Sequence, residues 1–221
     1  MSKIFVSRYL EHDSVLLDHF NKNQWSTTHM SLIEFSSIAF EKPWADWLFF
    51  YSKKGVKYYF DQIPVQRVRS HKFACFGPGT ASYLLDNYGF MPDFIGTGEK
   101  QSTADLFKDT IDDETVCFIA GQNSLRSIQE IWGDGVESSE VCVYNNRPRL
   151  SVDLGHYDVA IVTSPMNYES FVTNGGTTNC LISIGKTTSM AIKSKTPQCV
   201  YEESAEPSEM SILKTLLSVV S

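Results

Sequence analysis

The chain has 221 residues, of which 42% are hydrophobic and 20% are charged, a balance that is ordinary for a globular protein of one large or two small domains. Its formal net charge of −7 argues against non-specific nucleic-acid binding, which needs a basic face to neutralise phosphates. The apolar runs are too short to cross a bilayer and the first residues carry no signal-peptide pattern, so we expect a cytoplasmic protein without a membrane partner.

Short apolar strands alternate with amphipathic helices along the chain. The strands are expected at 3–7, 31–40, 47–51, 73–76, 90–94, 115–120, 140–144, 158–163, 181–184 and 198–201. The helices are expected at 14–21, 102–108, 124–132 and 208–219, and after the turns at residues 52, 80, 164 and 188. This alternation predicts an α/β protein with parallel sheets and right-handed crossover connections.

Two stretches share a strand, a glycine-led turn that ends in threonine, and a helix start. CFGPGTASYLL and LISIGKTTSMAI place Gly77 and Gly185 108 residues apart, and Thr80 and Thr188 lie at the same spacing. Such a turn directs backbone N–H groups and hydroxyls toward whatever lies above the strand ends. The pattern therefore indicates two ligand-facing turns.

The two turns belong to a longer internal repeat. DWLFFYS corresponds to DVAIVTS 112 residues later, with Ser52 and Ser164 as candidate helix N-caps. The strand and helix that open the chain have their counterpart after the first copy of the repeat, at 115–132. The order of the units therefore predicts that the opening segment joins the C-terminal half.

The expected domains are consequently discontinuous. One consists of residues 1–35 together with 147–221, and the other of residues 38–142. Two extended stretches, 32–40 and 140–148, would run side by side as a linker that permits hinge motion.

Cysteine and histidine spacing gives no metal-ligand pattern. The five cysteines form no CxxC pair, which is typical of free thiols in a reducing compartment. The five histidines show neither HxH nor HxxxH spacing, so we expect no metal site.

Neither glycine turn completes a nucleotide-binding motif. Ser82 stands where a dinucleotide fingerprint needs its third glycine, and Cys180 stands where a Walker loop needs its first. What remains is a set of hydroxyls at strand ends, namely Ser52, Thr80, Ser164, Thr187 and Thr188. Two interpretations stay open: these residues only cap helices, or both halves face one cleft that binds an elongated polyanion. Tyr144 ends the linker strand, either as a packing residue or at the mouth of that cleft.

Eight segments, in order, extend this pattern almost from end to end. They are Ser7-Arg8, EFSSIAF, DWLFFYSKKGVKYYF, FGPGTASYLLDNYG, the turn from Gly121 to Arg126, EVCVYNNRP, DVAIVTSPMNYESF and IGKTTSMAI. Together they resemble the uroporphyrinogen-III synthase family. The resemblance implies two similar parallel-sheet α/β domains, joined by a two-stranded β-ladder, with the substrate cleft between them.

The resemblance also implies an activity. It indicates a cofactor-free enzyme of tetrapyrrole (heme) biosynthesis that dehydrates hydroxymethylbilane, a linear tetrapyrrole with eight carboxylates. A monomer is our default expectation and does not follow from the resemblance. The enzyme inverts the last ring, ring D, through a spiro intermediate and closes the macrocycle as uroporphyrinogen III. Since the azafulvene formed by loss of hydroxide is reactive, most of the catalysis would be positioning.

The family's linker tyrosine aligns with Tyr144, a phenol suited to protonate the leaving hydroxyl. The expected substrate-binding residues are Arg8, Ser52, Gly79, Thr80, Ala81, Ser164, Lys186, Thr187 and Thr188. The family usually has Thr-Arg where this chain has Ser7-Arg8, and Gly-Pro where it has Gly185-Lys186. The alternative is therefore a catalytically weak or inactive tetrapyrrole-binding or anion-binding regulatory module of the same fold.

Overall fold

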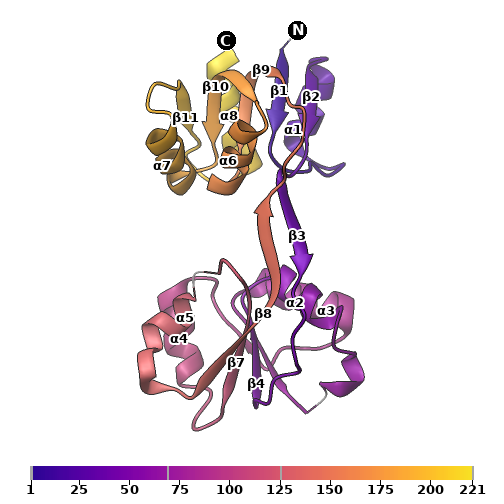
Figure 1. The fold of residues 1–221 in the computed structure, drawn as a ribbon, viewed down its shortest axis with the longest axis vertical. Helices are drawn as coiled ribbons and strands as arrows, with labels where there is room; N and C mark the ends of the chain where they lie inside the picture. Colours follow the sequence, from indigo (N-terminus) through magenta and orange to yellow (C-terminus); the bar gives the residue numbers. More distant parts are fainter. Residues whose placement is uncertain (1, 69, 125, 221) are drawn as a thin grey trace. The chain divides into compact units, whose positions relative to one another are not determined.

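The computed structural model describes residues 2–68, 70–124 and 126–220, with the main chain alone at Asp134. The chain forms two compact units (Figure 1). The discontinuous unit comprises Met1–Glu34 and Arg147–Ser221, and the continuous unit comprises Phe35–Asn146. The chain passes from one to the other within β3 (Ile33–Ser37) and again within β8 (Ser138–Pro148).

The continuous unit is built on a six-stranded sheet in the order β3-β8-β7-β4-β5-β6. Its elements are β4 (Trp47–Phe50), α2 (Lys53–Phe60), β5 (Lys72–Cys75), α3 (Pro78–Tyr88), β6 (Phe94–Ile95), α4 (Lys100–Lys108), β7 (Val116–Gly121) and α5 (Ser127–Trp132). Short 3-10 turns occupy Val65–Arg67 and Gly133–Gly135. The five strands from β8 to β6 are parallel. The β3 strand runs antiparallel to β8, since Leu32 accepts from Arg149 while Ile38 donates to Val143.

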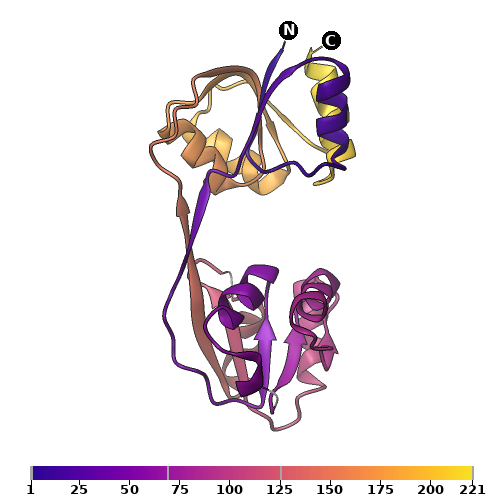
Figure 2. The ribbon, with the colours of Figure 1, turned by 90° about the vertical axis from the view of Figure 1, so that its right-hand side faces the viewer.

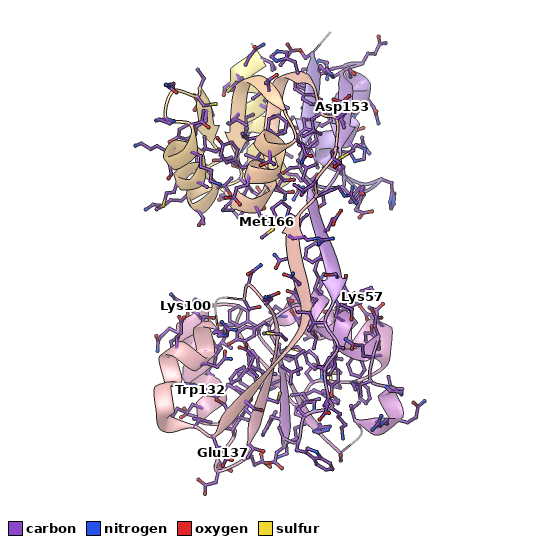
Figure 3. The ribbon with its side chains drawn as sticks, in the orientation of Figure 1. Lys57, Lys100, Trp132, Glu137, Asp153 and Met166 are labelled. Carbon is purple, nitrogen blue, oxygen red and sulfur yellow. The ribbon has the colours of Figure 1, made fainter. Side chains whose placement is uncertain are left out.

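Helices cover both faces of this sheet, α2 and α3 on one side and α4 and α5 on the other (Figure 1). Strand alternation divides the core accordingly. Leu48 and Phe50 face α2 and α3, whereas Trp47 and Phe49 face α4 and α5. Trp132, labelled in Figure 3, closes the second core and donates its indole N–H to the Ala104 carbonyl at 2.9 Å.

The discontinuous unit is a five-stranded parallel sheet in the order β11-β10-β9-β1-β2. Its elements are β1 (Lys3–Val6), α1 (Val15–Lys22), β2 (Ser26–His29), β9 (His156–Val162), α6 (Pro165–Thr173), β10 (Thr177–Ser183), α7 (Lys186–Lys195), β11 (Tyr201–Glu203) and α8 (Glu209–Val220). Helices α6 and α7 pack on one face, and α1 and α8 lie side by side on the other (Figure 2).

The two sheets share one topology. The order β8-β7-β4-β5-β6 matches β2-β1-β9-β10-β11, and the helix pairs α2–α3 and α4–α5 match α6–α7 and α8–α1. The internal repeat in the sequence thus corresponds to a repeated fold. The expected α/β class, with two parallel sheets and a pair of connecting strands, is confirmed.

Several local expectations are confirmed by hydrogen bonds at the helix ends. The Ser52 and Ser164 side chains accept the Gly55 and Asn167 N–H groups, so both serines are N-caps. The structure also shows that helix α3 ends at Tyr88 and is followed by Gly89 as its C-cap, with a φ of 73° in the left-handed region that glycine tolerates.

Other expectations are wrong. Helix α4 begins at Lys100, two residues before the expected start, and the Glu99 carboxylate caps it. Residues 90–93 are not a strand, and α5 begins at Ser127 rather than at residue 124. The polar strand β2 was not expected, since its sequence STTH lacks the apolar pattern of a strand.

Two further properties concern the described part of the chain as a whole. None of its helices combines the length and apolar character needed to span a membrane. All five cysteines are free, with Cys75, Cys117 and Cys180 buried.

Candidate functional site

A bulge between β7 and β8 positions Tyr144. Ala120 pairs with Cys142, and the next pair is Gly121 with Tyr144, so Val143 is an extra residue on β8. Val143 packs into the core under α2 and α3, and after the bulge Tyr144 packs against the same core. In a regular strand Tyr144 would point to the opposite face of the sheet from Val143.

The Tyr144 ring lies directly on Gly121. A Cβ atom built at Gly121 would lie 2.4 Å from Cζ of Tyr144, so the ring can occupy this place only because residue 121 lacks a side chain. The other contacts of the ring are Tyr58, stacked at 5.4 Å between centroids, and Phe35 at 6.0 Å. Residue 125, in the turn that follows Gly121, lies outside the described residues.

Tyr144 lines a cavity of about 540 Å³ in the continuous unit, here called the Tyr144 cavity. Its walls come from the end of β4, the first residues of α2, the glycine turn before α3, and the loop after β6. The lining residues are Tyr51, Ser52, Lys53, Lys54, Phe76, Gly77, Pro78, Gly79, Thr80, Gly98 and Tyr144.

The glycine turn presents the start of α3 to this cavity. Gly77 caps the helix without a side chain, and its carbonyl accepts the N–H groups of Thr80 (3.1 Å) and Ala81 (3.2 Å). The Gly79 N–H has no hydrogen-bond partner in the described part of the chain. Because the first N–H groups of a helix carry partial positive charge, this end suits a carboxylate.

Two phenols line the Tyr144 cavity, and their surroundings differ. The Tyr51 hydroxyl donates to the Gln129 side chain and accepts the Ile128 N–H at 3.2 Å, which fastens it to α5. Burial raises the pKa of Tyr51 far above its usual value. The Tyr144 hydroxyl makes no hydrogen bond to any residue that the structure describes. Tyr144 is therefore the phenol that remains available to a ligand.

The second glycine turn lines a cavity of about 370 Å³ in the discontinuous unit, here called the Lys186 cavity. The Gly185 carbonyl accepts the N–H groups of Thr188 (3.0 Å) and Ser189 (3.1 Å), as Gly77 does in the first turn. Thr188 is buried, whereas Lys186 and Thr187 are exposed. The far wall of the cavity runs from Glu203 to Pro207 and so carries the carboxylates of Glu203 and Glu206.

Some of the expected site residues line the Tyr144 cavity, some line the Lys186 cavity, and some line neither. Ser52, Gly79 and Thr80 line the Tyr144 cavity, and Lys186, Thr187 and Thr188 line the Lys186 cavity. The buried Ala81 and the capping Ser164 line neither cavity.

Arg8 also lies outside both cavities. Its guanidinium forms an ion pair with the Glu209 carboxylate at 2.8 Å, and the Ser14 hydroxyl donates to the other oxygen of Glu209. The cation expected to bind substrate is thus already paired within the discontinuous unit.

Several residues of the Tyr144 cavity or its support were not among the expected site residues, and they include Gly98, Gly121, Lys53 and Lys54. Gly98 belongs to the loop that packs against the turn, where a Cβ on Gly77 would lie 3.0 Å from the Gly98 Cα. The two lysines could have been singled out from the sequence, because they are the two residues after the N-cap candidate Ser52.

Two repeated parallel α/β units, each with a glycine-led helix start beside a cavity, define a two-domain α/β protein of duplicated design. The family model described as "Uroporphyrinogen-III synthase HemD" matches residues 15–213. The chain belongs to this family.

Solved structures agree in fold. The uroporphyrinogen-III synthetase of Helicobacter pylori superposes with a TM-score of 0.71 at 16% identity, covering 99% of this chain and 100% of the other. A mutant uroporphyrinogen III synthase of Thermus thermophilus superposes with a TM-score of 0.57 at 12% identity, covering 100% of this chain and 99% of the other. No curated protein sequence matches the chain.

Proposed function

We propose that the protein is an active uroporphyrinogen-III synthase, which converts hydroxymethylbilane to uroporphyrinogen III without a cofactor. Membership of the family supports this proposal. The observation that carries it is the placement of Tyr144, whose hydroxyl lacks a partner in the described part of the chain, in a cavity that also receives the start of α3.

Tyr144 acts as the general acid. Its phenol gives a proton to the substrate hydroxyl as the C–O bond breaks, water leaves, and the pyrrole nitrogen supplies the electron pair that forms the azafulvenium. The substituted α-carbon of the last ring then bonds to the methylene carbon of the azafulvenium, which gives the spiro intermediate. The older bond from that α-carbon to its bridging carbon breaks, the ring turns over, and its unsubstituted α-carbon bonds to the freed bridging carbon. Loss of the proton from this carbon restores the aromatic ring, and the Tyr144 phenolate takes that proton back. The proton account therefore closes with water as the only by-product.

Carboxylate binding holds the chain for this attack. The Gly79 N–H and the hydroxyls of Ser52 and Thr80 act in the Tyr144 cavity, and the α7 turn at Thr187 and Thr188 binds further carboxylates. Arg8 contributes only where a substrate carboxylate replaces Glu209. The five free thiols support a cytoplasmic, reducing location, and a monomer is sufficient because each cavity is formed within one unit.

The test is incubation of the protein with freshly prepared hydroxymethylbilane, followed by chromatographic separation of the product isomers. Isomer III is the expected product, because the uncatalysed reaction gives uroporphyrinogen I. Formation of isomer I alone, at the rate of the buffer control, would refute the proposal.

The second candidate is a module of the same fold that binds a tetrapyrrole but lacks the chemistry. Glu203 and Glu206 line the Lys186 cavity and weaken its hold on a carboxylate, so a ligand bound in the Tyr144 cavity would be positioned less firmly for ring closure. Tight binding of a tetrapyrrole polycarboxylate without formation of isomer III would select this candidate.

A further inference from the structure

Two lysines lie at an end of α2 that electrostatics makes unfavourable for them. Lys53 and Lys54 are the first two residues of the helix, directly after the Ser52 cap, and the first turn contains no acidic residue. The positive end of the helix dipole disfavours cations there. A negatively charged ligand at this helix end would therefore interact favourably with both exposed lysines.

Nothing in the described part of the chain supplies that charge, since neither lysine forms an ion pair there. Lys57, one turn further along α2 and labelled in Figure 3, is paired with Asp61 at 2.5 Å. The same helix thus contains a lysine with an internal counter-charge and two lysines without one.

The surroundings hold both lysines at the Tyr144 cavity. Lys54 Nζ lies 3.8 Å from the centroid of the Phe35 ring, which also contacts Tyr144. Cε of Lys53 would be 3.7 Å from a Cβ on Gly79, so its side chain lies along the first turn of α3. Burial lowers the pKa of Lys54, with the charge of Lys57 as the second cause, so a nearby anion would stabilise its charged form.

The lining of the two cavities differs in charge. The Tyr144 cavity is lined by two lysines and, among the residues described, by neither Asp nor Glu. The Lys186 cavity is lined by one lysine and two glutamates. Carboxylate binding is therefore favoured much more strongly in the Tyr144 cavity.

We propose that Lys53 and Lys54 are the specificity-determining cations of the Tyr144 cavity, which bind carboxylates of the substrate and select for a molecule with many carboxylates. The proposal rests on the proposed function for the identity of that polycarboxylate. In this proposal the two lysine side chains bind the substrate carboxylates more strongly than the turn amides and hydroxyls do.

The test compares two fluorescent porphyrins as binding probes for the full chain. Uroporphyrin III carries eight carboxylates and coproporphyrin III carries four. At low salt the wild type should bind uroporphyrin III at least about 10-fold more tightly than coproporphyrin III. The double variant Lys53→Gln/Lys54→Gln should bind uroporphyrin III about 10-fold or more weakly than the wild type does. The double variant should also show a weaker dependence of Kd on salt concentration.

Lys57→Gln is the matched control, since it removes one charge from α2 outside the cavity, and its Kd should change less than about 2-fold. Lys53→Arg/Lys54→Arg should keep most of the uroporphyrin affinity. An unchanged Kd in the glutamine double variant, or an equal loss in Lys57→Gln, would overturn the inference.

Turnover separates this inference from the proposed function. If wild type makes isomer III and the double variant keeps its KM, only the lysine assignment fails. If wild type makes no isomer III but the lysines still control uroporphyrin binding, the proposed reaction fails and the cation site stands.

Discussion

Substitution of Gly121 by alanine should remove most activity by moving Tyr144. The new Cβ would lie 2.4 Å from Cζ, 2.6 Å from Cε2 and 2.8 Å from the hydroxyl oxygen of Tyr144. Carbon atoms in contact are normally about 3.5 Å apart, so the ring must move by about 1 Å. The ring stacks on Tyr58, and this contact must shift as well.

A displacement of about 1 Å at a reacting group costs on the order of 10²-fold in rate. We therefore expect kcat for isomer III formation to fall about 10²-fold in Gly121→Ala, with a smaller change in KM. In Tyr144→Phe the fall in kcat should be at least as large. The double variant Gly121→Ala/Tyr144→Phe should have a kcat no lower than that of Tyr144→Phe, because both changes act through the Tyr144 hydroxyl. Stopped assays with isomer separation measure all three variants.

Gly176→Ala provides a matched control for crowding. Its Cβ would lie 2.6 Å from the Phe171 ring in the discontinuous unit, where no acid group is displaced. Both alanine variants should lose about 1–3 kcal/mol of stability in urea unfolding, since both overpack a ring. Only Gly121→Ala should lose kcat. Normal kcat in Gly121→Ala, with Tyr144→Phe inactive, would refute the positioning argument.

Three further outcomes concern the continuous unit. Tyr59→Phe should raise the free energy of unfolding by about 1 kcal/mol in urea titrations, because the fully buried Tyr59 hydroxyl has no hydrogen-bond partner among the residues that the structure describes. Burial lowers the pKa of His71 below 6.5, although its ring nitrogen forms a hydrogen bond with the Ala45 carbonyl at 2.7 Å. The stability that the neutral ring contributes should therefore be fully present above pH 6.5 and be lost as pH falls through the folded-state pKa. Unfolding at pH 7.5 and 5.5 measures this loss, which His71→Gln should reduce. Gly77→Ala should weaken binding of uroporphyrin III several-fold, since its Cβ would lie 3.0 Å from Gly98 and displace the turn, and an unchanged Kd would contradict this reasoning.

The repeat made the fold predictable. Spacings of 108 and 112 residues located equivalent turns and caps, and Ser52 and Ser164 occupy equivalent N-cap positions in the structure. Local chemistry of this kind is encoded within a few residues, so a sequence pattern can reveal it.

Features that depend on distant residues could not be predicted. Nothing in EVCVY signals the bulge that brings Tyr144 to the same side of the sheet as Val143. In the sequence Arg8 has no evident counter-charge, because its partner Glu209 lies 201 residues away. The strand β2 has a polar sequence because it lies at the edge of its sheet.

The isomer composition of the product shows whether the protein catalyses ring inversion and whether Tyr144 is required for it. Hydroxymethylbilane is mixed with wild type or Tyr144→Phe and quenched before the uncatalysed reaction completes, and the uroporphyrin isomers are separated after oxidation. We expect isomer III in large excess with wild type and a product close to the buffer control with Tyr144→Phe. Isomer I alone with the wild-type protein would mean that the chain does not catalyse ring inversion.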